Sequence, residues 1–214
     1  MSSSGTPNRE IENITSLRRR GLLTAEAYEL HLAALGVKAP GAGRRSWWLQ
    51  PFAILVAVVG CVVGIPAVIF QELQAAFGPF VAAPVIEEAM KPAGIYILML
   101  RWPQALLGRL HTALLAALAG LTFGLIESFI YVKVYFPDEG SDFVLFRFTV
   151  PVLMHTVASF IVGYGLSRTV IDWAAGRAPF PKVTRNFYFA AVALHAIYNT
   201  AAVILSLTGV LEFD

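Results

Sequence analysis

Five long apolar runs constrain the fold of this chain more than any other feature of its sequence. They cover residues 47–70, 77–100, 110–135, 144–167 and 187–209 of a 214-residue chain. Each is close to the ~20 residues that a helix needs to cross the hydrocarbon core of a bilayer. Hydrophobic residues make up 57% of the chain and charged residues only 14%, whereas soluble domains carry about 25% charged residues. The sequence therefore predicts an all-α, polytopic membrane protein with about five transmembrane helices.

The residues before the first run form a separate, polar segment. Apolar side chains recur at helical spacing in residues 9–36 and Gly21 interrupts the pattern, which predicts a small helical hairpin. Residues 37–46 form a basic linker. We therefore expect two parts: a cytoplasmic N-terminal segment over 1–46 and a transmembrane domain over 47–214.

The distribution of basic residues predicts the orientation of the chain. Of the 16 lysines and arginines, seven lie in segment 1–46, two in 101–109 and four in 168–185. With five spans, these three segments lie on one side of the membrane, and the opposite loop 134–142 is acidic. Because cytoplasmic loops are enriched in Lys and Arg, we expect a multi-pass protein of the cell membrane with a cytoplasmic N-terminus and an extracytoplasmic C-terminus. The net charge of only +2 gives no indication of nucleic acid binding.

Three charged residues interrupt the second apolar run: Glu87, Glu88 and Lys91. A charge near the centre of a bilayer costs at least ~2.5–3.5 kcal/mol, and such residues commonly mark functional sites. Lys91 lies one helical turn after both glutamates, so it can neutralise Glu88 and leave Glu87 free to react. Pro84 and Pro92 flank the group, and because proline cannot donate a backbone hydrogen bond, they predict a kinked helix.

The later runs also carry polar groups. Glu127 lies in the third run, His155 in the fourth, and His195 and Asn199 share one face of the fifth. At ~1.5 Å of rise per residue, these groups and Glu87 fall within a slab about 9 Å thick. Each residue alone is explained by helix packing, but their common depth on four helices predicts a functional site.

The chemistry of these groups suits hydrolysis of a peptide bond. In one scheme Glu127, His155 and His195 hold a zinc ion and Glu87 acts as general base, as in His₂Glu hydrolases. In a metal-free scheme Glu87 activates water with help from histidine, while His195 and Asn199 donate to the oxyanion. Nothing in the sequence indicates a serine or cysteine nucleophile or an organic cofactor.

Two other functions use the same residues. A small ion or proton carrier could use the buried glutamates and histidines for coordination or relay. A catalytically inactive membrane scaffold could bind a partner helix through them. The pair His195-x-x-x-Asn199 favours hydrolysis, because a proton relay does not need a fixed amide.

The motifs resemble a known family. Those that carry the resemblance are Glu87-Glu88-x-x-Lys91, Phe123-x-x-x-Glu127, a single histidine at His155, and His195-x-x-x-Asn199. Together they look like the PrsW family of intramembrane proteases, over residues 77–200. That family is distantly similar to the CAAX- and bacteriocin-processing (CPBP) membrane proteases.

The resemblance implies roles for these residues and a class of substrate. In the CPBP proteases the first glutamate of the pair activates water, and the last histidine and asparagine form the oxyanion hole. Glu127 stands where those proteases have a histidine, which leaves room for a metal site. The implied activity is endoproteolysis of a membrane-anchored protein, as in site-1 cleavage of an anti-sigma factor, with the lipid bilayer as the other partner. Residues 16–28 also resemble the short SHOCT-type helical modules.

Overall fold

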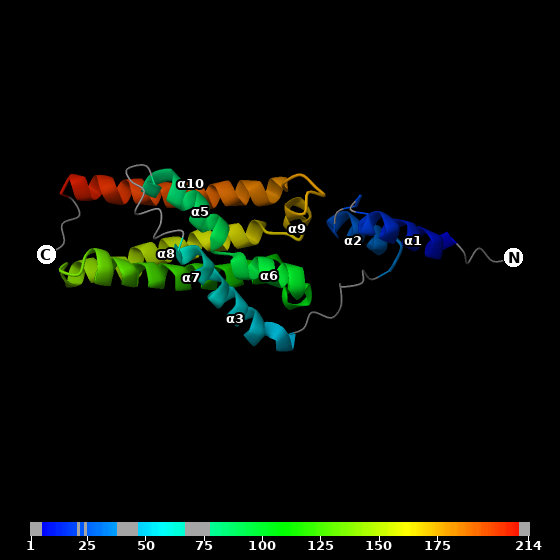
Figure 1. The fold of residues 1–214 in the computed structure, drawn as a ribbon, viewed down its shortest axis with the longest axis horizontal. Helices are drawn as coiled ribbons and strands as arrows, with labels where there is room; N and C mark the ends of the chain where they lie inside the picture. Colours follow the sequence, from blue (N-terminus) through cyan, green and yellow to red (C-terminus); the bar gives the residue numbers. More distant parts are fainter. Residues whose placement is uncertain (1–5, 21, 24, 38–46, 67–77, 210–214) are drawn as a thin grey trace.

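A computed structural model describes residues 6–20, 22–23, 25–37, 47–66 and 78–209 of the protein. Within these ranges the chain forms helices and turns and contains no strand (Figure 1), so the predicted all-α class is confirmed. Much of the predicted basic linker, residues 38–46, lies outside the described ranges.

Three long helices form the body of the molecule. They are α7 (Arg109–Ile130), α8 (Ser141–Gly165) and α10 (Lys182–Leu207). A π-helical turn, Tyr131–Tyr135, extends α7. With this extension, these are the three helices in the described residues that are long and apolar enough to cross a membrane. They lie side by side in Figure 1 and correspond to the last three predicted runs.

The first two apolar runs form shorter helices. After a 3₁₀ turn at Trp47–Leu49, the first run contains α3 (Gln50–Gly60) and a 3₁₀ turn at Cys61–Gly64. This apolar stretch is shorter than a bilayer span. Parts of both runs lie outside the described residues, so the count of five transmembrane helices stays a prediction.

The second run is interrupted at Pro92, one of the two prolines that predicted a kink, while Pro84 lies in the first turn of a helix. A π-helical turn at Gly78–Ala82 leads into α5 (Ala83–Met90), and α6 (Ala93–Arg101) follows. The N–H of Lys91 still bonds the carbonyl of Glu87 at 2.9 Å. Pro92 has no N–H to continue the pattern, so the helix is interrupted there. A 3₁₀ turn, Pro103–Ala105, then precedes α7.

Small residues allow α7 and α8 to approach closely. A Cβ atom added at Gly120 would overlap the carbonyl oxygen of His155 and the side chain of Ser159. A Cβ at Gly163 would overlap the Cβ of Ala116 in the same way. Because bilayer lipids are as apolar as leucine, close packing of this kind is a main source of helix association in membranes. It also fixes the height of His155 relative to α7.

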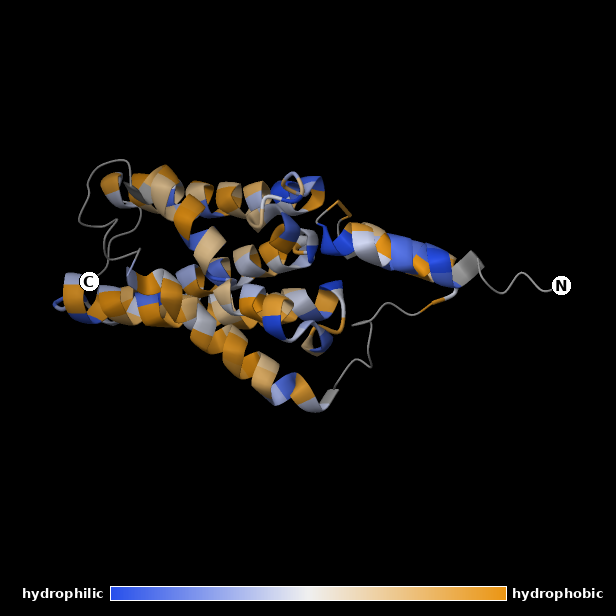
Figure 2. Cartoon of the chain, turned by 45° about the vertical axis from the view of Figure 1, so that its right-hand side comes forward, coloured by the Kyte–Doolittle hydropathy of each residue, from blue (hydrophilic) through white to orange (hydrophobic). Residues whose placement is uncertain are grey.

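The N-terminal hairpin packs at one end of the long helices. Its helices, α1 (Thr6–Arg19) and α2 (Ala25–Ala34), enclose a small apolar core. Arg18 Nη1 lies 2.7 Å from Oδ1 of Asp172, a buried residue of the short helix α9 (Thr169–Ala174). Figure 2 shows that hydrophilic residues concentrate on this hairpin and hydrophobic ones on the other helices. The boundary between 1–46 and 47–214 stays a prediction.

The basic segments gather at this same end. The hairpin contacts the segment between α8 and α10 through Arg18 and through an ion pair of 2.9 Å between Arg168 and Glu29. Arg109, at the start of α7, lines one cleft together with Lys182, at the start of α10. That the three basic segments share one side of a membrane stays a prediction.

We predict that Gly120→Val destabilises the protein by about 1–3 kcal/mol, because the added methyl groups overfill the contact between α7 and α8. The measurement is the melting temperature of purified protein in detergent. Ala190→Val is the matched control, since it adds comparable volume on an exposed face of α10. A Gly120→Val protein as stable as the control would show that the helices are not in close contact here.

Candidate active site

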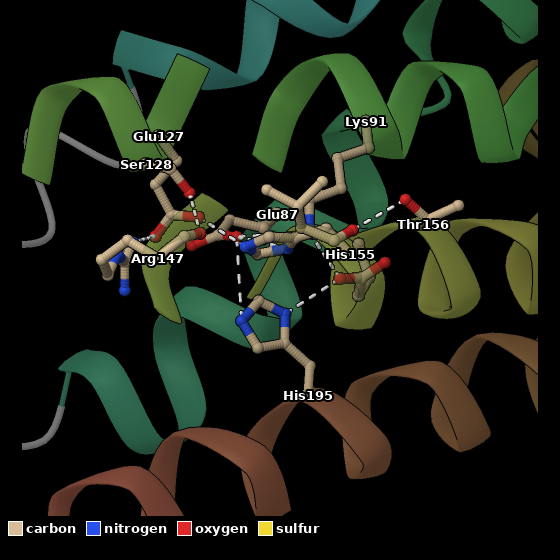
Figure 3. Close-up of polar contacts among 10 residues, drawn as sticks. Glu87, Lys91, Glu127, Ser128, Arg147, His155, Thr156 and His195 are labelled. Carbon is tan, nitrogen blue, oxygen red and sulfur yellow. Dashed lines mark hydrogen bonds and ion pairs between the residues drawn. The ribbon is translucent and has the colours of Figure 1, made fainter. Parts of the chain in front are cut away.

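A buried ammonium lies at the centre of the polar cluster (Figure 3). Lys91 follows α5 directly and its side chain is fully buried. Its Nζ lies 2.6 Å from Glu88 Oε1, 2.7 Å from His155 Nδ1 and 3.3 Å from Glu87 Oε2. It also lies 4.6 Å from the centre of the Phe123 ring. Lys91 therefore joins α5 to α8 and neutralises Glu88, as the sequence predicted.

The contacts of His155 fix its tautomer. A lysine ammonium can only donate hydrogen bonds, so His155 Nδ1 must accept the one from Lys91. The ring proton of a neutral imidazole then lies on Nε2, which contacts Glu127 Oε2 on α7. This proton is donated to the Glu127 carboxylate. Lys91, His155 and Glu127 thus form a hydrogen-bonded chain across three helices.

His195 carries its ring proton on the other nitrogen, Nδ1. Its Nδ1 lies 2.9 Å from Glu88 Oε1, the same oxygen that binds Lys91. A carboxylate accepts hydrogen bonds, so the proton of the neutral ring lies on Nδ1. The lone pair on Nε2 is then available, and this atom lies 3.9 Å from Glu87 Oε2. Tyr188 helps to place α10, because its hydroxyl donates to the carbonyl of Val85 on α5 at 2.7 Å.

Glu87 differs from its neighbour Glu88 in lining the cavity described below. Its side chain is only 4% exposed, yet Oε2 makes no hydrogen bond to the residues that the structure describes. The nitrogen atoms His195 Nε2 and His155 Nδ1 lie 3.9 Å and 4.0 Å from it. Its ion pair of 3.3 Å with Lys91 Nζ supplies a counter-charge, but a buried acceptor that receives no hydrogen bond is unfavourable. This oxygen is therefore suited to accept a proton or to bind a ligand.

A cavity of about 300 Å³ adjoins the cluster. Its polar wall includes Glu87, Glu127, His155 and Asn199. The aromatic part of its wall consists of Tyr131, Phe136, Phe143, Phe146 and Tyr198. The cavity is thus a mainly apolar space with a few convergent polar groups, which is typical of ligand sites.

The structure brings all seven predicted site residues together. Glu87, Glu127, His155 and Asn199 line the cavity, while Glu88, Lys91 and His195 lie in contact with them. Their catalytic roles stay predictions. Among the charged residues of the cavity wall, sequence reasoning missed Arg147. The available signal was a basic residue at the start of the fourth apolar run, away from the three basic segments.

The three residues whose donor atoms come closest together are not the predicted metal ligands Glu127, His155 and His195. One donor atom each from Glu87, His155 and His195 lie within 4.8 Å of one another. Glu127 instead binds the far nitrogen of His155. The His₂Glu donor set is nevertheless the one that the sequence suggested.

One family model matches most of the chain. It is described as "PrsW family intramembrane metalloprotease", and the match covers residues 46–213. No curated protein and no solved structure gives a significant match.

We predict that Glu88→Gln is much less stable than Glu87→Gln. Glu88 is the nearest counter-charge of the buried Lys91 and also binds His195, and removing one partner of a buried ion pair costs about 3–5 kcal/mol. Glu87 Oε2 makes no hydrogen bond, so its replacement should lower the melting temperature less. Equal melting temperatures for the two variants would contradict this division of roles.

Proposed function

The chain belongs to the PrsW family of intramembrane metalloproteases, as its motifs predicted, and we propose that it is an endopeptidase that hydrolyses a membrane-anchored protein. One observation carries the proposal beyond the family: the carboxylate oxygen Glu87 Oε2 is buried, lacks a hydrogen bond and belongs to a cavity-lining residue. A general base needs an accessible lone pair next to the space where substrate binds.

In the proposed reaction, a water molecule donates to Glu87 Oε2 and to His195 Nε2. These two acceptors are 3.9 Å apart, a separation that one water can bridge. Glu87 takes a proton as the water oxygen bonds to the peptide carbonyl carbon. The same proton passes to the amide nitrogen when the C–N bond breaks, so the carboxylate is regenerated. Glu88 holds the His195 ring in the required tautomer.

Asn199 is proposed to stabilise the oxyanion. It lies one turn after His195 on α10 and lines the cavity. Its amide N–H groups are donors at any pH, whereas Nε2 of a neutral His195 with its proton on Nδ1 is an acceptor. His195 could donate to the oxyanion only as a cation. We therefore assign the oxyanion contact to Asn199 and the water contact to His195.

The residues present also fit a divalent metal ion. Glu87, His155 and His195 would hold it. The available Nε2 of His195 suits a ligand, because metal-binding histidines commonly donate their other N–H to a carboxylate such as Glu88. His155 Nδ1 would first have to leave the Lys91 ammonium. A zinc ion at this position would act as a Lewis acid toward the peptide carbonyl.

We propose that the cavity faces the extracytoplasmic leaflet. Its wall is built from the end of α7, the start of α8 and the second half of α10. The basic hairpin and α9 lie at the opposite end, which the positive-inside rule places in the cytoplasm. The N-terminus is then cytoplasmic and the C-terminus extracytoplasmic. A single-pass substrate would be cut near its extracytoplasmic membrane boundary, as in site-1 cleavage of an anti-sigma factor.

We predict that Glu87→Gln lowers peptide cleavage by at least roughly 100-fold, because the amide cannot accept the proton of the attacking water. The assay uses purified full-length protein and a defined pool of apolar synthetic peptides, with products identified by mass spectrometry. Glu139→Gln, in the exposed turn between α7 and α8, is the matched control and should retain wild-type activity. Normal cleavage by folded Glu87→Gln would exclude Glu87 as the base.

A zinc ion would occupy the Glu87 and His195 atoms that bind water in the metal-free reaction, so the metal content decides between the two schemes. The zinc scheme predicts about one zinc ion per chain in protein purified without chelators, and loss of this ion in His195→Ala, since His195 offers the available nitrogen ligand. The readout is elemental analysis. His31→Ala, in the N-terminal hairpin, is the control and should keep the metal. Active protein that contains no metal would overturn the zinc assignment and support the metal-free reaction.

A further inference from the structure

Arg147 is a nearly buried cation next to the proposed catalytic residues. It lies on α8, roughly two turns before His155, and its side chain is only 11% exposed. The guanidinium carbon lies 3.8 Å from the centre of the Tyr131 ring. Its Nη2 lies 3.7 Å from Glu127 Oε1. Arg147, Tyr131 and Glu127 all line the cavity.

The guanidinium has a counter-charge but lacks hydrogen-bond acceptors. Its Nε and Nη2 atoms are buried and make no hydrogen bond to the described residues. The contact with Glu127 is an ion pair, but at 3.7 Å it is too long for a hydrogen bond. Nε and Nη2 lie on one edge of the planar group, so their N–H bonds point in the same direction. This edge requires oxygen acceptors that the described residues do not supply.

The charges around the cavity favour a neutral acceptor over a carboxylate. Arg147 and Lys91 are the cations in contact with the cluster, and its carboxylates outnumber them. The carboxylates are Glu87, Glu88 and Glu127. A further negative group in this low-dielectric space would be repelled. A carbonyl oxygen satisfies the guanidinium donors without adding charge.

An unwound substrate segment offers such oxygens. In a membrane, a peptide that leaves the helical conformation exposes carbonyl groups that lipid cannot satisfy. The proposed peptidase reaction requires this conformation, because the attacked carbonyl must be accessible. The unsatisfied donors of Arg147 and the unsatisfied acceptors of the substrate are thus complementary. The aromatic residues of the cavity wall provide an apolar surface for the neighbouring side chain.

We propose that Arg147 is a substrate-positioning residue whose Nε–Nη2 edge binds a main-chain carbonyl of an extended, apolar substrate segment. The inference rests on the proposed peptidase function and adds the class of substrate: an uncharged segment recognised through its main chain. Replacing the side chain leaves the backbone contact of this residue intact, because Ser128 Oγ donates to the backbone carbonyl of Arg147 at 2.6 Å.

The cleavage test compares wild type, Arg147→Gln and Arg147→Lys on the same peptide pool. We expect Arg147→Gln to lower kcat/KM by roughly 10- to 100-fold, which is the effect of losing one or two charge-assisted hydrogen bonds. The factor should be the same for all cleavage sites, since main-chain recognition is independent of sequence. Arg147→Lys should recover only part of the loss, because it lacks the planar edge. Arg185→Gln removes an exposed arginine of α10 and is the control.

A binding test separates this inference from the proposed reaction. One apolar peptide from the pool is titrated into Glu87→Gln and into Glu87→Gln/Arg147→Gln, with affinity measured by fluorescence anisotropy. The peptide is then resynthesised with an alkene in place of each peptide bond in turn. We expect one alkene to weaken binding to Glu87→Gln roughly tenfold and to have no effect when Arg147 is also replaced.

Further outcomes decide between the positioning role and the alternatives. Equal kcat/KM or equal affinity with and without the guanidinium would exclude it. A loss confined to peptides with acidic side chains would show that Arg147 reads a carboxylate. Methylguanidinium added to Arg147→Ala should restore cleavage. If it does not, and the variant also has a lower melting temperature, the loss of cleavage reflects a purely structural role of Arg147. Normal cleavage by Glu87→Gln would reject the proposed reaction alone, because the binding result stands independently.

Discussion

The structure depends on the pairing of one buried ammonium. Lys91 is fully buried, and an unpaired charge in such a position is strongly destabilising. It binds Glu88 on its own helix and His155 on α8, and Glu88 in turn binds His195 on α10. Forming these contacts brings three helices together at one level. The close approach of α7 and α8 at Gly120 then places Glu127 against His155.

This pairing leaves the two adjacent glutamates in different states. Glu88 Oε1 accepts hydrogen bonds from Lys91 and His195, so it holds the site together. Glu87 Oε2 receives none from the described residues and belongs to the cavity wall, so it is the group left to react or to bind a ligand. The same distinction applies to the histidines: both nitrogens of His155 are engaged, whereas Nε2 of His195 is directed toward Glu87. The site is therefore organised by residues that do not themselves need to contact substrate.

Much of the fold was predictable because hydrophobicity and proline act locally. The three long helices follow the last three apolar runs, and the interruption of the second run falls at Pro92. The full extent of the first two runs lies partly outside the described residues, so the count of five spans stays a prediction. The predicted metal ligands included Glu127, whereas the donor atoms that converge belong to Glu87 and the two histidines. Arg147 was overlooked because its sequence neighbours give no sign that it faces Glu127.

The sequence by itself determined the all-helical class, the family and the seven polar residues of the site, because these follow from composition, periodicity and short motifs within single helices. Only the tertiary structure decided which of the two adjacent glutamates lines the cavity, which nitrogen of each histidine carries the proton, and which arginine joins the cavity. These properties depend on distances between side chains on different helices. Spacing along one helix fixes the face on which a residue lies, but only the packing of neighbouring helices fixes what that face meets.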